Sequence, residues 1–411
     1  KAVNPKVKVV VKYPNWYEHF QGLGFNLETE PPLFDGIYTG TETRNAFAPG
    51  QHLQPYLGYQ IFRYFENIKP GGNGGGWVDT GGMTSMDRYA EQLWLTLFAK
   101  APEITLFDFR QMQRTIRPAD RAAWQDQKPV FDYDEMIKPY TLSNGKQVTP
   151  TTVARAAGYT FDKVDGFLGK LGKPLGIQGY RPYHSTGEDF LHNYLGMIGL
   201  PMDLKPEFPN DPKMILLTES AKFDPDIVKK IKARLMAGKD VTITSGLLRA
   251  LSGKGIEDII ELEYTDRKAL VTDFSAGMFG SANKASKEIL IPQIMYLTND
   301  SWTDVEALGG PVGWPLLHQG RYGNASMFVL TIPESFGDLY ELPEGVLNRV
   351  RDVLSPDLKF RIEGPSMVSL FVYDNNTLIV ESFLDEETKV KVIAGSGITK
   401  LTDIVSGAVL A

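Results

Sequence analysis

The first 110 residues alternate apolar segments typical of strands with segments of helical periodicity. β-Branched residues crowd positions 7–13, and another apolar segment covers 33–38, so both predict strands. Apolar and aromatic residues at 54–68 recur every three or four positions, which predicts a helix, and 86–100 repeats this pattern. A further strand is predicted at 104–109. Strands and helices in this order are typical of parallel βα units.

A glycine-rich segment at 71–76 lies between the two predicted helices, where we expect a turn that leads into Trp77, Val78 and Asp79. Aromatic and charged residues gather where the predicted strands end. This pattern suits a (β/α)8 barrel whose active site lies on that face. About half of such a barrel fits into this part of the chain. The predicted fold class is therefore α/β, and it begins with the C-terminal part of a (β/α)8 barrel.

The chain changes character after the last of these units. Residues 120–173 are polar and irregular, and we expect an excursion from the barrel and a linker there, with an Asn-Gly turn. Two apolar strands then follow, at 214–217 and 241–244, and they flank a basic amphipathic helix at 226–237. This order indicates a doubly wound α/β sheet.

From about residue 339 to the end, the periodicity becomes two. Residues 367–373 and 377–381 alternate in this way around an Asp-Asn-Asn turn, which predicts a β-hairpin. We therefore expect the chain to close with a small antiparallel β-sandwich.

Composition narrows the chemistry. The 411 residues contain no cysteine, which excludes a disulfide framework, a thiolate nucleophile and thiolate metal sites. A net charge of -7 without a Lys/Arg block argues against a nucleic-acid partner. No apolar run is long enough to predict a membrane span, and the first residues lack a signal-peptide pattern. Because the chain starts at Lys1, we expect it to be the C-terminal part of a longer protein.

The segment Thr-Gly-Thr-Glu-Thr-Arg follows the second predicted strand and contains the first catalytic candidate, Glu42. Glycosidic bond hydrolysis needs a carboxylate near the anomeric carbon, and Arg44 or Tyr38 could lower its pKa or orient it. Trp16, Tyr17 and Tyr38 lie near strand ends and offer flat apolar faces to sugar rings. The structural alternative is an ion pair between Glu42 and Arg44 in a loop. We favour a sugar site, with these aromatic residues and Arg44 as substrate-binding groups.

Asp79 is the second catalytic candidate. The glycines around it would let the backbone approach a ligand, and Trp77 places an aromatic ring beside the carboxylate. The alternative is a solvent loop with a helix-capping aspartate, and the sequence leaves both open. Phosphate binding is not indicated, because neither GxxxxGK[ST] nor a properly placed GxGxxG occurs.

Two other constellations favour structural interpretations. His184, Glu188 and His192 would share one face of a continuous helix, as a metal site requires, but the helix is expected to start near 186–187. Glu188 is then a first-turn acid, and no metal site is predicted. The segment 244–247 invites comparison with a nucleophile elbow, yet it lacks G-x-S-x-G, and we expect a strand-to-loop turn.

The order of these parts resembles the three-domain plan of family 42 glycoside hydrolases. The resemblance is carried by a barrel strand that ends in a glutamate, by the helix and strands that follow, and by ITLFDFRQ at 104–111, where the chain leaves the barrel. It implies a partial catalytic barrel at 1–172, a glutamine-amidotransferase-like (flavodoxin-like) α/β domain at 173–336 and a β-sandwich at 337–411. The middle domain has no nucleophilic cysteine, so we expect it to be a structural or oligomerisation element and not a second enzyme. Family 164 β-mannosidases share the plan and are the other candidate family.

Family 42 enzymes are retaining β-galactosidases, commonly trimeric through the middle domain, and the resemblance places their nucleophile at a late strand end. Glu42 takes this role here. If 104–109 is the eighth strand, however, Asp79 ends the seventh and becomes the nucleophile. The acid/base carboxylate is expected on an earlier strand, upstream of Lys1.

The resemblance thus implies a retaining exo-acting β-glycosidase that removes terminal sugars from oligosaccharides without a cofactor. A β-mannosidase and a β-galactosidase both fit, and a homotrimer in the periplasm or outside the cell is expected, with no membrane or nucleic-acid partner. The alternatives are a non-catalytic carbohydrate-binding or scaffold protein on the same fold and a barrel hydrolase of uronic chains.

Overall fold

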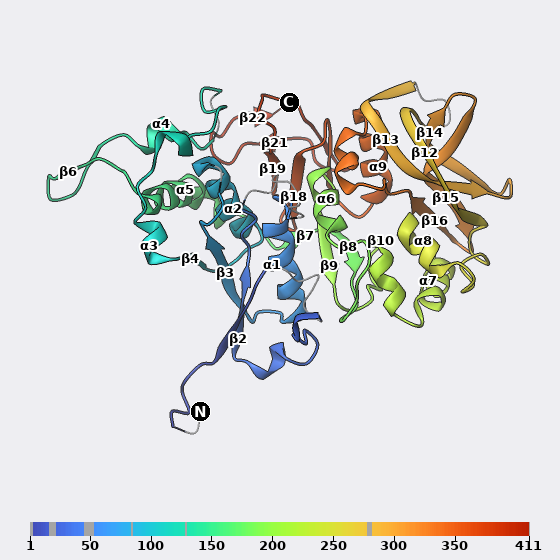
Figure 1. Cartoon of the computed structure of the whole chain (residues 1–411), viewed down its shortest axis with the longest axis horizontal. Coiled ribbons are helices and arrows are strands. Elements are labelled where there is room, and N and C mark those ends of the chain that lie inside the picture. The colour runs from blue at the N-terminus through green and yellow to red at the C-terminus, as the bar shows by residue number, and fades with distance from the viewer. Residues whose placement is uncertain are drawn as a thin grey trace.

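The computed structural model describes residues 3–15, 22–44, 53–83, 85–127, 130–277 and 282–410. Figure 1 shows the N-terminal βα units at one end of the molecule and long antiparallel strands at the other. The last strands return between these two parts. No helix in the described ranges is long and apolar enough to cross a membrane.

The N-terminal sheet has four parallel strands in sequence order. Ile37 and Val78 point to the helical side and are buried there, which is why apolar residues recur in these strands. The parallel βα units predicted from the sequence are therefore confirmed. The elements are β1 (Val10–Tyr13), β2 (Gly36–Gly40), α1 (Leu57–Ile68), β3 (Asn73–Asp79), α2 (Met86–Phe98) and β4 (Ile104–Phe107).

Three strand boundaries and one element differ from the predictions in this region. The first strand begins at Val10 and not at residue 7. The second strand begins later than expected because Pro31–Leu33 forms a 3-10 helix. The strand predicted at 104–109 ends early, since the Asp108 carboxylate accepts the backbone N–H of Gln111 and starts helix α3 (Phe109–Met112). The prediction of a glycine-rich turn at 71–76 is wrong, because most of this segment belongs to strand β3.

These glycines are needed for close approach rather than for a turn. A Cβ on Gly75 would overlap the backbone of Glu103, and one on Gly76 would overlap the side chain of Thr96. The strand can therefore lie against its neighbours only where side chains are missing.

We expect Gly75→Ala to destabilise the protein by about 1–3 kcal/mol, because the new methyl group must displace the backbone of Glu103. Gly158→Ala is the matched control. It lies in the exposed face of helix α5 with open space around it, and it should stabilise the protein by about 0.5–1 kcal/mol. Urea denaturation of both variants measures the difference. A neutral Gly75→Ala would contradict the close approach.

The region predicted as irregular, 120–173, contains a long helix, α5 (Val153–Leu168). It packs on α2, and the Trp94 indole N–H donates to the carbonyl of Thr160 at 2.9 Å. The predicted Asn144-Gly145 turn is confirmed between the short strands of a hairpin. The remaining elements here are α4 (Tyr133–Met136), β5 (Tyr140–Thr141) and β6 (Gln147–Val148).

The middle of the chain forms a nine-stranded mixed sheet in the order β13-β12-β14-β15-β16-β11-β10-β8-β9. Strands β9, β8, β10, β11 and β16 are parallel, which confirms the doubly wound pattern, whereas the antiparallel remainder was not predicted. The strands are β8 (Ile177–Tyr180), β9 (Met202–Lys205), β10 (Met214–Leu217), β11 (Asp240–Thr244), β12 (Leu262–Ala276), β13 (Ala282–Tyr296), β14 (Ser301–Gly309), β15 (Val312–Tyr322) and β16 (Ala325–Leu330).

Helices bury both faces of the parallel part of this sheet. Ile215 packs with helices α7 and α8 on one face, while Leu216, the next residue, belongs to the core on the other face with α6 and α9. This is why β10 is apolar at every position. The helices are α6 (Leu191–Met197), α7 (Ile227–Met236), α8 (Ser245–Leu251) and α9 (Glu344–Leu354).

The closing module contains the predicted hairpin, β18 (Val368–Tyr373) with β19 (Leu378–Ser382). Helix α9 lies inside the segment that was predicted to have a period of two, so that prediction is wrong for its first part. The short β7 (Pro174–Leu175) pairs with β18 and ties the module to the middle of the chain. The other strands are β17 (Phe360–Glu363), β20 (Lys391–Ala394), β21 (Leu401–Thr402) and β22 (Val409–Leu410).

Candidate active site at the strand ends

Glu42 lies two residues beyond the C-terminal end of β2, and only 2% of its surface is exposed. Its main chain is held from two sides. The Asn15 amide donates to the carbonyl of Glu42 at 2.6 Å, and the N–H of Thr41 donates to the carbonyl of Trp77 at 3.0 Å. The carboxyl oxygen Oε2 of Glu42 is buried, and within the described ranges it has no hydrogen-bond partner.

Helix α2 fixes the segment that carries Glu42. The side-chain oxygen of Gln92 accepts the backbone N–H groups of Thr43 at 2.8 Å and Arg44 at 2.9 Å. The hydroxyl of Thr96, one turn later on the same helix, donates to the hydroxyl of Thr41 at 2.7 Å. Sequence reasoning missed both helix residues. Their signal was two polar residues on an otherwise apolar helix face.

Arg44 pairs with one of the two predicted carboxylates. Its guanidinium lies 3.3 Å from Asp79, so the Glu42–Arg44 ion pair that was the structural alternative does not form. Asp79 also accepts the backbone N–H of Gly81 at 2.6 Å. The two carboxylates thus have different surroundings, with Asp79 neutralised by a cation and Glu42 buried beside it.

Burial raises the pKa of Glu42 to about 7, because removal from water disfavours its charged form. A backbone hydrogen bond and the charge of Arg44 act in the opposite direction, and the charge of Asp79 adds to the increase. A carboxyl group with this pKa exchanges its proton near neutral pH, which suits acid/base or nucleophilic chemistry.

The predicted aromatic residues separate into groups. Trp77 lies near Gly40, packs edge-on against Phe107 with ring centres 6.4 Å apart, and remains at the strand ends. Tyr38 instead directs its hydroxyl to Glu103, which precedes β4 and so lies at the opposite end of the sheet from Glu42. Trp16 and Tyr17 fall outside the described residues.

The His184, Glu188 and His192 spacing does not form a helix face. His184 and Glu188 have φ values of 60° and 49°, and α6 starts only at Leu191, so Glu188 is not a first-turn acid. Burial lowers the pKa of His192 to about 3. Among the described residues, no group of three His, Cys, Asp or Glu could hold a metal ion.

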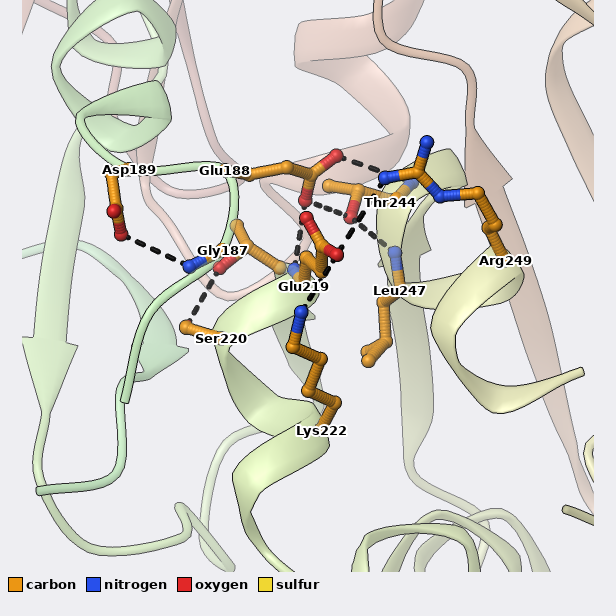
Figure 2. A network of polar contacts seen from close by, with 11 residues as sticks. Gly187, Glu188, Asp189, Glu219, Ser220, Lys222, Thr244, Leu247 and Arg249 are labelled. Carbon is orange, nitrogen blue, oxygen red and sulfur yellow. Dashed lines mark hydrogen bonds and ion pairs between the residues drawn. The ribbon is translucent and has the colours of Figure 1, made fainter. Parts of the chain in front are cut away.

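Glu188 instead joins its own loop to two segments, the one after β10 and the junction of β11 with α8 (Figure 2). Its carboxylate accepts the N–H groups of Glu219 at 2.8 Å and Gly246 at 3.2 Å, and the hydroxyl of Thr244. The hydroxyl of Ser245 accepts the N–H of Ile332 at 3.0 Å. The segment 244–247 is therefore a strand-to-helix junction with a structural serine, and not an elbow with a free nucleophile.

Comparison with known proteins finds family models that match three parts of the chain. Residues 1–170 match the model of a probable glycosyl hydrolase catalytic domain, and residues 359–411 match the model of a probable glycosyl hydrolase C-terminal domain. Both matches support a glycoside hydrolase. Residues 172–335 match the second domain of the uncharacterized protein SSO3021.

The chain is also similar to the whole of that protein, SSO3021 of Saccharolobus solfataricus, at 23% identity over 405 residues. The match covers 94% of this chain and 61% of the relative, so the chain spans about three fifths of the length of this relative.

Two solved structures have a fold similar to that of this chain. The chain is similar to a GH42 β-galactosidase from G. stearothermophilus with a TM-score of 0.57 and 10% identity, over 100% of this chain and 62% of that chain. The chain is also similar to an α-L-fucosidase isoenzyme 2 from Paenibacillus thiaminolyticus, with a TM-score of 0.52 and 13% identity. This match covers 98% of this chain and 61% of that chain. The resemblance to the family 42 plan is thus confirmed as one of fold.

Proposed function

We propose that the protein is a retaining exo-acting β-glycosidase, with a terminal β-mannoside or β-galactoside as substrate and Glu42 as nucleophile. The supporting observation is the buried carboxyl group of Glu42 at a strand end, inside the segment that matches a glycosyl hydrolase catalytic domain. Its Oε2 has no hydrogen-bond partner in the described part of the chain, and its pKa lies near neutrality. Carboxylates at the C-terminal ends of parallel strands are the usual catalytic groups of such folds.

In this mechanism Glu42 Oε2 attacks the anomeric carbon, the bond to the leaving sugar breaks, and a covalent glycosyl-enzyme forms. A second carboxyl group protonates the leaving oxygen and later takes a proton from the water that releases the sugar. Asp79, which pairs with Arg44 at the neighbouring strand end, is the competing nucleophile.

The pH dependence of kcat/KM should reveal the role of Glu42. A nucleophile must be ionised, so activity should rise with pH up to about 7, where the Glu42 carboxyl loses its proton, and fall about tenfold per unit below it. Initial rates on an aryl glycoside between pH 4 and 9 measure this limb. An alkaline limb near 7 with no acid limb there would identify Glu42 as the general acid instead.

The function is tested by incubating the full-length protein with a panel of aryl β-glycosides and following the first-formed anomer by NMR. We expect hydrolysis of a mannoside or galactoside with retention, and loss of activity in Glu42→Gln. A protein that binds these sugars but cleaves none would instead be the carbohydrate-binding scaffold. Equal turnover by the variant would remove Glu42 from the mechanism. A homotrimer, a periplasmic or secreted location and the kinship with family 164 stay predictions.

A further inference from the structure

Two side chains beside Glu42 have polar atoms without a hydrogen-bond partner among the described residues. Asn15, just after β1, is 2% exposed, and its amide group donates to the main chain of Glu42 at 2.6 Å. Its carbonyl oxygen Oδ1 is buried and, within the described ranges, without a hydrogen-bond partner. The same holds there for the indole nitrogen Nε1 of Trp77 on β3. A buried polar atom without a partner requires an explanation, and at a strand end beside Glu42 a bound ligand is one.

Gly40 shows that the main chain of Asn15 and the ring of Trp77 lie close together. The point where a Cβ of Gly40 would stand is 3.0 Å from the backbone nitrogen of Asn15 and 3.1 Å from Cε2 of Trp77. Those two atoms are therefore no more than about 6 Å apart, since each lies about 3 Å from that point. Cε2 is the ring carbon bonded to Nε1. Asn15 and Trp77 thus flank the strand end that leads to Glu42, and they pack against Gly40 so closely that no side chain would fit there.

Asn15 Oδ1 and Trp77 Nε1 are together complementary to one chemical group. Asn15 Oδ1 is a carbonyl oxygen and can only accept a hydrogen bond, while its amide nitrogen donates to Glu42. The indole N–H of Trp77 can only donate one. A hydroxyl group does both at once. A carboxylate would be repelled by Oδ1 and by the neighbouring Glu42 and Asp79, and an ammonium group has no lone pair for the indole.

We propose that Asn15 and Trp77 bind the same hydroxyl group of the sugar on which Glu42 acts, and so determine which sugar is accepted. The proposal rests on the proposed glycosidase function. It makes Asn15 a specificity residue, with a second task in holding the main chain of Glu42. Sugar rings carry several hydroxyl groups whose orientation differs between mannosides and galactosides, so one pair of fixed partners can discriminate between them.

The test uses the full-length protein, the best aryl β-glycoside from the panel, and its deoxy analogues, each lacking one hydroxyl group. Asn15→Ala removes the acceptor, and Trp77→Phe removes the donor but keeps a flat ring. Each change should lower kcat/KM about 10- to 100-fold on the parent substrate. One deoxy analogue should be poor for the wild type and no poorer for either variant. The double variant should lose little more than the worse single variant, because both residues act on one hydroxyl.

Asn144→Ala, in an exposed hairpin turn, is the matched control and should leave kinetics unchanged. Asn15→Ser provides a smaller change if Asn15→Ala does not fold. The same loss on every deoxy analogue would show that Asn15 only supports the main chain of Glu42, and it would overturn the proposal. Independent losses that multiply in the double variant would also overturn it. A wild type inactive on every glycoside would refute the glycosidase function itself, and this inference with it.

Discussion

Replacing Glu42 with glycine is expected to lower hydrolysis of the best aryl β-glycoside by about 10⁴-fold, and sodium azide should restore part of the turnover. The variant lacks the carboxylate that forms the covalent intermediate. Azide is small enough to enter the space left by the side chain and attacks from the same face of the sugar. The product of this reaction is an α-glycosyl azide, which NMR distinguishes from the β-anomer.

Asp79→Gly is the comparison that decides between the two candidates. If Asp79 were the nucleophile, its glycine variant would produce the α-azide and the Glu42 variant would not. A β-glycosyl azide from the Glu42 variant would show that Glu42 is the acid/base, because azide then replaces the water that attacks the intermediate. If azide has no effect on either variant, neither Glu42 nor Asp79 is the nucleophile.

Glu42→Gln provides a stability control on the same residue. The folded-state pKa of about 7 lies above the ordinary 4.5, so proton binding favours the folded state, and this contribution is lost as pH rises from about 4.5 through 7. Glutamine has no ionisable group, so the variant does not lose this stability as the pH rises. The variant should therefore be more stable than the wild type at pH 8, by about 2–3 kcal/mol, and not at pH 4. Denaturation at both pH values measures this difference.

Arg351→Ala is expected to destabilise the protein by about 4 kcal/mol, the largest effect away from the site. Arg351 on α9 is fully buried, and its guanidinium donates to the carbonyls of Ile198, Gly364 and Pro365, each at 2.7 Å. Removing it leaves three buried acceptors without donors and a cavity where the middle sheet meets the closing module. Urea denaturation measures the loss.

Burial lowers the pKa of Arg351 to about 10, so the side chain is charged at neutral pH and strengthens these bonds. Arg351→Lys should recover only part of the stability, because an ammonium group cannot reach three carbonyls in a planar fork. Arg361→Ala is the control. Its ion pair with Asp352 is more than one third exposed on both sides, and its loss should cost less than about 1 kcal/mol. Equal effects of the two alanine variants would contradict the role given to Arg351.

Local pattern was enough to find several elements of this fold. Helices α1 and α2 have strong three- and four-residue periodicity, and β10 and β11 are apolar at nearly every position, so their own residues determine what they can form. The place of Glu42 just after an apolar strand is visible for the same reason. Strands β12 and β13 were not predicted, because many of their residues are exposed and their pairing partners are other strands of the sheet.

The sequence by itself determined the parallel βα order, the hairpin of β18 and β19, and the presence of Glu42 and Asp79 at neighbouring strand ends. Only the tertiary structure decided that Arg44 pairs with Asp79, and that Gln92 and Asn15 hold the segment of Glu42. These partners come from other elements of the fold, up to 49 positions away, so no local pattern contains them. The glycines of β3 show the same limit. A run of glycine permits either a turn or a close approach, and the neighbouring backbone of Glu103 selects between the two.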